Sequence, residues 1–149
     1  MLYERARVMN AYDRAALREQ LALHEGYRPK PYRCTAGKLT IGHGRNLDDV
    51  GIDGDEARYL LEKDITRCLA DLAEFHWFHQ LDAVRQRALI DMRFQLGPAG
   101  FRGFRKMIAA LERRDFDTAA IQAADSKWAS RDTPRRAAKV IQMLKSGEA

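Results

Sequence analysis

Three residues in the first third of the chain have side chains that could together do acid–base or nucleophilic chemistry: Glu25, Cys34 and Thr40. A glutamate can act as a general acid, and a thiolate can orient water, deprotonate it or attack a carbon atom itself. A threonine hydroxyl can donate and accept a hydrogen bond, so it can hold a water molecule.

A helix that ends at Glu25 is expected to present the acid. Leu17 and Leu21 recur at helical spacing, and Gly26 is a residue that stops helices because it tolerates positive φ. Asp13 is the predicted N-cap. The negative end of the helix dipole disfavours a carboxylate at the C-terminal end, which favours the protonated form that a general acid needs.

A small hairpin is predicted directly after this helix. Residues 32–34 and 39–41 have the pattern of two short strands, and residues 35–38 have the composition of the turn between them. The helix end and the hairpin would gather the three candidate residues in one place.

The spacing of these residues resembles the motif of the phage-type lysozymes, or muramidases, the family of the T-even phage lysozymes. In that motif a Glu is followed after eight residues by Asp or Cys, and after five more by Thr, as at Glu25, Cys34 and Thr40. The threonine lies in TIGHG, which is similar to the family's Thr-Ile-Gly-x-Gly. Further similar segments follow in the same order at 88–97, 99–104, 116–120, 126–128 and 133–141. Two departures are Cys34 and Arg45, which stand where the T-even enzyme has Asp and His.

This resemblance implies a single α+β, lysozyme-like domain. It implies a small N-terminal lobe with a short antiparallel hairpin or sheet at about 13–53, a linking helix at about 54–75, and a larger helical lobe at 76–149. The implied activity is that of an endolysin, which hydrolyses the β-1,4 bond between N-acetylmuramic acid and N-acetylglucosamine in peptidoglycan. The implied enzyme acts as a monomer without a cofactor or metal.

Substrate contacts carry over from the same matches at five positions: Gln95, Gln122, Lys127, Trp128 and Arg136. Arg136 also matches the family arginine that pairs with the catalytic Glu. Each position has a simpler alternative, since a Trp in a helical lobe usually belongs to the core and an Arg in a basic helix is usually solvated. An ion pair between Arg45 and Asp64 is expected where the family has a histidine–aspartate pair.

The rest of the chain is predicted to be helical with short links. Asp53 and Glu56 have the spacing of a capping box, and a long helix over about 54–74 follows. Further helices are predicted to begin at Asp82, near Phe104, at Asp115 or Asp117, and at Thr133, with Gly97-Pro98 ending the first of them. Residues 2–10 have the pattern of a short amphipathic turn or helix. His76 and His79 lack a third ligand in pattern, so packing is favoured over a metal site.

The composition is that of a globular protein with a localised excess of positive charge. The net charge is +5, and residues 127–145 alone hold six basic residues against one acidic residue. This segment is either a solvated helix face or a surface that attracts a polyanion, but no nucleic-acid recognition motif accompanies it. Neither a membrane span nor a secretory signal is evident. We therefore expect synthesis in the host cytoplasm and action on the cell wall in the periplasm after the membrane is permeabilised. A rival interpretation is a non-catalytic peptidoglycan-binding module of the same fold.

Overall fold

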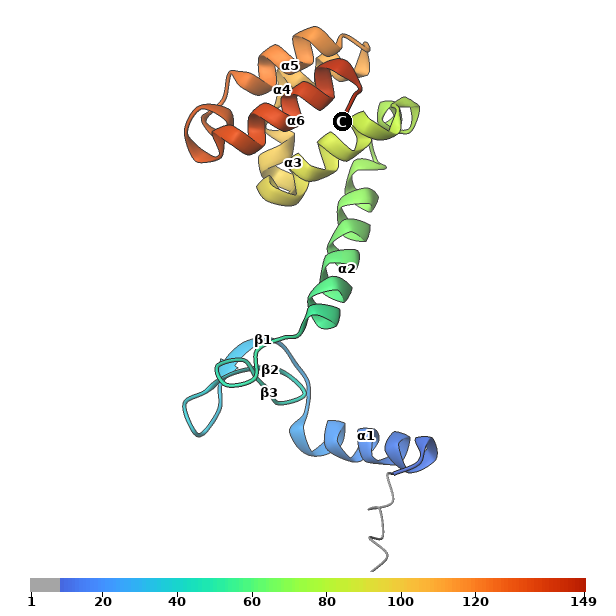
Figure 1. Ribbon diagram of the computed structural model, residues 1–149, viewed down its shortest axis with the longest axis vertical. Helices are drawn as coiled ribbons and strands as arrows, with labels where there is room; N and C mark the ends of the chain where they lie inside the picture. Colours follow the sequence, from blue (N-terminus) through green and yellow to red (C-terminus); the bar gives the residue numbers. More distant parts are fainter. Residues whose placement is uncertain (1–8) are drawn as a thin grey trace, which may run out of the picture. The chain divides into compact units, whose positions relative to one another are not determined.

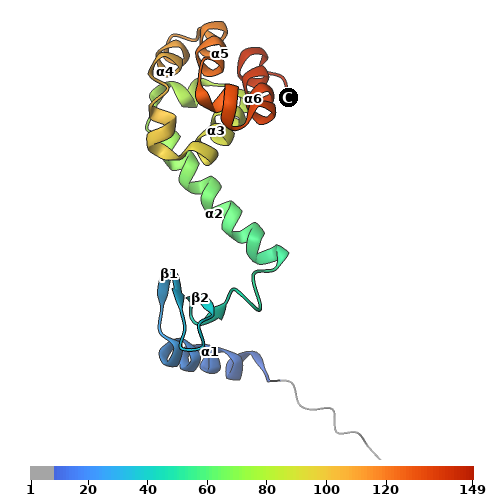
Figure 2. The ribbon, with the colours of Figure 1, turned by 90° about the vertical axis from the view of Figure 1, so that its left-hand side faces the viewer.

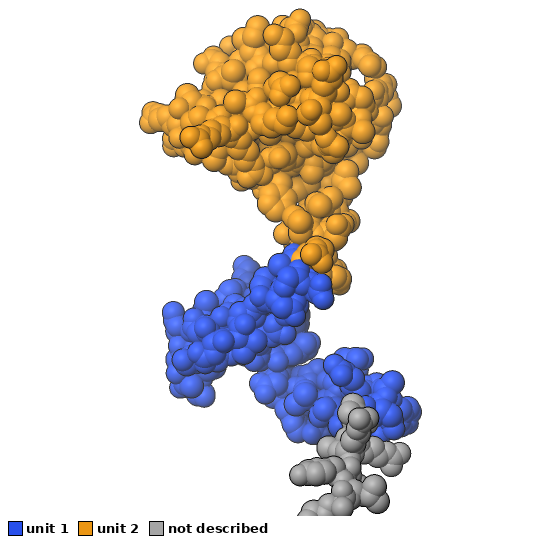
Figure 3. All heavy atoms as spheres, in the orientation of Figure 1, with its two compact units in different colours: residues 1–57 blue, residues 58–149 orange. Residues whose placement is uncertain are grey.

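The structure, a computed structural model that describes residues 9–149, divides the chain into two compact units, residues 1–57 and 58–149 (Figure 3). It is mostly helical with one small antiparallel sheet, which confirms the predicted α+β, lysozyme-like class. The elements are α1 (Ala11–Glu25), β1 (Arg28–Arg33), β2 (Leu39–Gly42), β3 (Arg45–Asn46), α2 (Gly54–Leu72), η1 (His76–Gln80), α3 (Ala83–Arg102), α4 (Arg105–Glu112), α5 (Phe116–Ala124), η2 (Trp128–Asp132) and α6 (Pro134–Ser146) (Figure 1). The division into lobes stays a prediction, and most of the turn or helix predicted for residues 2–10 lies outside the described residues.

Helix α1 ends where the sequence predicts but begins differently. Its N-cap is Asn10, whose side-chain oxygen accepts a hydrogen bond from the backbone N–H of Asp13 at 2.9 Å. The prediction that Asp13 is the cap was therefore wrong. Asp13 lies in the first turn, where the positive end of the helix dipole stabilises its carboxylate. At the other end Gly26 has φ 73°, and its N–H donates to the carbonyl of Ala22.

The sheet has the order β1-β2-β3 and is antiparallel throughout. Figure 2 shows β1 beside β2. Strand β1 begins at Arg28, earlier than predicted, and contains both Pro29 and Pro31. An edge strand tolerates proline because its outward-facing backbone needs no N–H for the ladder, and the register between β1 and β2 shifts in this stretch. Strand β1 ends at Arg33, so Cys34 lies in the turn after β1 rather than in the strand.

Helix α2 begins with the capping box that the sequence predicts. The backbone N–H of Glu56 donates to Asp53 at 2.8 Å, and that of Asp53 donates to the Glu56 carboxylate at 3.2 Å. Arg45 also contacts this carboxylate, with an N–O distance of 2.7 Å. Asp64 pairs with Arg67 one turn along α2, and the expected Arg45–Asp64 pair, whose members belong to different units, stays a prediction.

The hydrophobic core described here belongs to the second unit, where α3, α4, α5 and α6 pack together (Figures 1 and 2). Its largest fully buried side chains are Leu72, Leu89, Met92, Phe101, Met107, Leu111 and Leu144. Gly97, with φ 76°, breaks the helical conformation inside α3, so the predicted stop is a kink after which the helix resumes. Among the described residues, no helix combines the length and the apolar character that a bilayer span requires.

The segments of α3 before and after the kink each form an ion pair with one aspartate near the end of α2. Asp71 pairs at 2.6 Å with Arg93, which precedes the kink, and at 2.6 Å with Arg102, which follows it. Desolvation by burial raises the pKa of the Asp71 carboxyl, but the hydrogen bonds from the two arginines outweigh it, so the pKa lies below the usual value. Asp71 therefore contributes stability that depends on its ionisation.

We predict that Asp71→Asn lowers the free energy of unfolding by about 2 kcal/mol at neutral pH, since it removes two charged hydrogen bonds at a half-buried site. Because the folded pKa is depressed, this contribution is complete above about pH 4 and is lost as the pH falls through the folded pKa. Urea unfolding at several pH values measures it. Asp64→Asn, which breaks the exposed Asp64–Arg67 pair on the same helix, is the control and should cost less than about 0.5 kcal/mol. Equal losses in the two variants would contradict the prediction.

Candidate active site

The side chain of Glu25 lies directly against the turn between β2 and β3. That turn is His43-Gly44, and both Gly44 and Gly42, the last residue of β2, have positive φ, 79° and 69°. A Cβ placed on Gly44 would be 2.6 Å from Oε2 of Glu25 and 3.0 Å from its carboxyl carbon. The carboxyl group therefore rests on the backbone of a residue that must lack a side chain.

His43 joins the same turn to the end of α1. Its Nδ1 lies 2.6 Å from the carbonyl oxygen of Gly26, the residue that follows Glu25. The His43 ring also contacts the ring of Tyr27, with centroids 5.5 Å apart. The turn is thus connected to the two residues that directly follow the acid.

Cys34 and Thr40 come together around the hairpin turn, at Lys38. The Lys38 carbonyl accepts hydrogen bonds from the backbone N–H of Cys34 and from the Thr40 hydroxyl, both at 2.9 Å. Thr40 is buried, with 4% of its surface exposed, and Cys34 is partly exposed. The structure therefore brings these two predicted residues together, with the thiol on the accessible side.

The environment of Cys34 favours its thiolate. Hydrogen bonds from the backbone of Lys38 and then Ala36 lower the pKa of the thiol, and they outweigh the opposing effect of desolvation, with a smaller contribution from the Thr40 hydroxyl. Cys68 differs, because burial in the second unit raises the pKa of its thiol. The two cysteines are therefore chemically distinct, and only Cys34 has the character of a reactive thiol.

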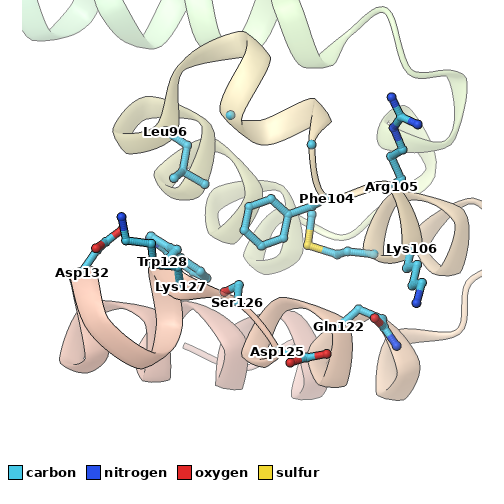
Figure 4. Close-up of a pocket in the computed structure, with 13 residues that line it drawn as sticks. Leu96, Phe104, Arg105, Lys106, Gln122, Asp125, Ser126, Lys127, Trp128 and Asp132 are labelled. Carbon is cyan, nitrogen blue, oxygen red and sulfur yellow. The ribbon is translucent and has the colours of Figure 1, made fainter.

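The second unit contains a pocket of about 620 Å³ that includes three of the predicted substrate residues: Gln122, Lys127 and Trp128. In Figure 4 Gln122 extends from α5, and Lys127 and Trp128 lie on the other side of Ser126. Leu96 and Phe104 line the pocket from other parts of the chain. Trp128 itself is only 3% exposed and packs edge-on against Phe104. Its burial supports the alternative that this Trp is mainly a core residue.

Gln95 forms hydrogen bonds to two other side chains of the second unit. Its amide oxygen accepts from the indole N–H of Trp128 at 2.9 Å, and its amide nitrogen donates to the Thr133 hydroxyl at 3.0 Å. Thr133, the N-cap of α6, makes no side-chain cap hydrogen bond. Gln95 therefore orients Trp128 and the start of α6.

Arg136 pairs with a residue of the second unit, while the pairing with Glu25 that the resemblance implies stays a prediction. Its Nε donates to the Asp91 carboxylate at 2.7 Å, on the surface of the second unit. His79, one of the two histidines considered for a metal, hydrogen-bonds through Nε2 to the Ala73 carbonyl at 2.9 Å, as the packing interpretation expects. Among residues 9–149, no group of three or more His, Cys, Asp or Glu side chains could hold a metal ion.

A family model described as phage lysozyme matches residues 22–145, which include the Glu25–Thr40 segment and most of the second unit. The chain belongs to the phage lysozyme family. This confirms the family suggested by the spacing of Glu25, Cys34 and Thr40. Membership of the phage lysozyme family supports a muramidase-type function with a peptidoglycan substrate.

Two relatives from Dictyostelium discoideum are similar to this phage lysozyme family member over nearly their whole length. One, named probable T4-type lysozyme 2, is 26% identical over 163 residues, covering 89% of this chain and 95% of the relative. The other, named probable T4-type lysozyme 1, is 24% identical with the same coverage. At this identity the comparison supports the family and leaves the role of each residue to be tested.

Sequence reasoning missed His43 and Gly44 as parts of the site, although both lie in the quoted TIGHG motif. The available signal was a pair of glycines one residue apart at the end of a predicted strand, which indicates a tight turn with positive φ. Nothing in the spacing indicated that this turn would lie against Glu25, because that contact joins residues far apart in the sequence.

We predict that Gly44→Ala lowers kcat by at least about tenfold, because the new methyl group displaces the Glu25 carboxyl from its seat. Gly51→Ala is the matched control, since Gly51 also has positive φ, 65°, but a Cβ placed there would lie an ordinary 3.9 Å from the backbone oxygen of Leu47. Both variants should lose about 1–2 kcal/mol of stability from backbone strain. Kinetics on purified sacculi and thermal melts separate the loss of kcat from the loss of stability. Equal activity in the two variants would contradict the proposed role of Gly44 in positioning the Glu25 carboxyl.

Proposed function

We propose that this protein hydrolyses the β-1,4 bond between N-acetylmuramic acid and N-acetylglucosamine in bacterial peptidoglycan. The observation that carries the proposal is the arrangement within the first unit. An exposed carboxyl group rests on Gly44, and a thiol with a lowered pKa contacts Thr40 in the neighbouring hairpin. These are the acid and the second group that glycoside hydrolysis requires.

Glu25 is the general acid in this proposal. It protonates the glycosidic oxygen as the bond to the anomeric carbon breaks, and so makes the departing sugar an alcohol rather than an alkoxide. Its position at the end of α1, packed against a turn, restricts a side chain that otherwise has three rotatable bonds. Such restriction matters because catalysis depends on holding the proton donor close to the leaving oxygen.

Cys34 is proposed to act as a thiolate that activates water. The thiolate takes a proton from the water while the water oxygen bonds to the anomeric carbon, and Thr40 helps to hold that water. The lowered pKa of Cys34 supports this role, since the thiolate forms at lower pH than that of an ordinary cysteine. Direct attack by sulfur on the anomeric carbon is the alternative, and it would give a thioglycoside intermediate that water later hydrolyses.

Substrate binding is proposed to involve Gln122 and Lys127, whose side chains line the pocket of the second unit. Gln95, Trp128 and Arg136 also carry over from the family motifs. The hydrogen bond between Gln95 and Trp128 supports an indirect role for these two, in which they shape the pocket. We further propose that the protein is made in the host cytoplasm, reaches the wall after the membrane is permeabilised and acts as a monomer.

Glu25→Gln is predicted to abolish hydrolysis while leaving the fold intact. Gln has nearly the same shape but cannot deliver a proton, and general acid catalysis contributes on the order of 100-fold or more. Mass spectrometry of sacculus digests measures the products of cleavage between the two sugars. Glu19→Gln, an exposed change on the same helix, is the control and should retain full activity.

The outcomes separate the two functions considered for this fold. If wild type and Glu25→Gln both bind sacculi without releasing muropeptides, the protein is a non-catalytic binding module. If the folded Glu25→Gln variant is as active as wild type, Glu25 is not the acid.

For Cys34, we predict that Cys34→Ala loses most activity and that Cys34→Asp retains much of it with an altered pH dependence, because a carboxylate can also activate water. Iodoacetamide should modify Cys34 at neutral pH and inactivate the enzyme, with peptidoglycan fragments slowing the loss. Cys68→Ala is the control and should be inactivated equally, because Cys68 is buried. A product with inverted anomeric configuration supports water activation, and a retained one supports attack by sulfur. Full activity of Cys34→Ala and of the alkylated protein would remove Cys34 from the mechanism.

A further inference from the structure

We infer that His43 is a positioning residue for the general acid, acting through its hydrogen bond to the carbonyl of Gly26. This inference rests on the proposed function, because it concerns how Glu25 is held. It assigns a role to the variable residue of the TIGHG motif, which neither the spacing of the motif nor the family match explains.

The first observation is where the hydrogen bond falls. Gly26 follows Glu25 directly and adopts φ 73°, a conformation in which the chain leaves the helix. Its N–H is bound inside α1, to Ala22 at 3.0 Å, while its carbonyl is bound outside α1, to Nδ1 of His43 at 2.6 Å. Both backbone polar groups of the residue that follows the acid are therefore hydrogen-bonded, and His43 supplies the contact from outside the helix.

The second observation is that His43 is adjacent to the residue on which the acid rests. Gly44, the next residue, leaves room for Oε2 of Glu25 and has no side chain of its own. The hydrogen bond of His43 and the seat at Gly44 therefore act on consecutive residues, Gly26 and Glu25. Loss of the hydrogen bond would let the turn move away from the helix end, and the carboxyl group would lose its seat.

The third observation concerns the chemistry of the imidazole. The carbonyl of Gly26 can only accept, so Nδ1 of His43 must carry a proton. A neutral His43 is then the Nδ1–H tautomer, with Nε2 unprotonated. Protonation of Nε2 leaves the Nδ1–H donor in place, so the contact does not depend on whether the ring is charged.

Three variants test the inference. His43→Ala removes the donor and should lower kcat about tenfold with little change in KM, because the acid is displaced while the binding residues of the second unit are untouched. His43→Asn keeps an N–H near the position of Nδ1 and should recover most of kcat. His79→Ala is the matched control, since His79 is also exposed, hydrogen-bonds to a backbone carbonyl and contacts an aromatic ring. It should leave kcat unchanged.

Thermal melts distinguish positioning from general stability. His43→Ala and His79→Ala should shift the melting temperature by similar small amounts, while only the former lowers kcat. A fall in kcat that Asn does not rescue, or equal activity in His43→Ala and wild type, overturns the inference.

A second measurement does not depend on activity. Nitrogen-15 NMR of the wild-type imidazole at a pH where His43 is neutral should show Nδ1 protonated and Nε2 bare. The opposite tautomer cannot donate to Gly26 and would overturn the inference even if the protein proves to be a non-catalytic module. If instead the tautomer is as expected and Glu25→Gln retains activity, the hydrogen bond stands and the proposed role of Glu25 fails.

Discussion

The candidate active site depends on one close contact, in which the carboxyl group of Glu25 rests on the backbone of Gly44. The contact requires a helix that ends at Gly26 and a turn that can adopt positive φ without a side chain. His43 connects these two segments by a hydrogen bond to Gly26. A flexible acid is thus held by short-range packing against the turn.

Cys34 depends on a second local constraint, the turn at residues 35–38. Lys38 accepts hydrogen bonds from Cys34 and Thr40 through its carbonyl, and its own backbone lowers the pKa of the Cys34 thiol. Backbone dipoles therefore stabilise an anion at a position where the T-even enzymes have a carboxylate. A thiolate at this place carries the same charge as that carboxylate but is more polarisable and more nucleophilic, which is why the stereochemistry of the product is informative.

The second unit supports function through a packed core and polar connections between helices. Asp71 pairs with α3 on both sides of the kink at Gly97, and Gln95 joins Trp128 to the start of α6. Each of these polar groups meets a partner, which is necessary because a half-buried polar group without one costs free energy. The basic residues of the C-terminal segment lie largely on the surface, where Arg136 is balanced by Asp91.

The sequence by itself determined the family, the fold class, the end of α1 at Glu25 and the capping box at the start of α2, because these follow from local patterns and from spacing. It also placed Cys34 and Thr40 on one hairpin. Only the tertiary structure decided that the turn at His43 and Gly44 meets Glu25, that Arg45 pairs with Glu56, and that Trp128 is buried. The physical reason is that side-chain partners and burial depend on which distant segments pack together, and neither periodicity nor composition records that packing.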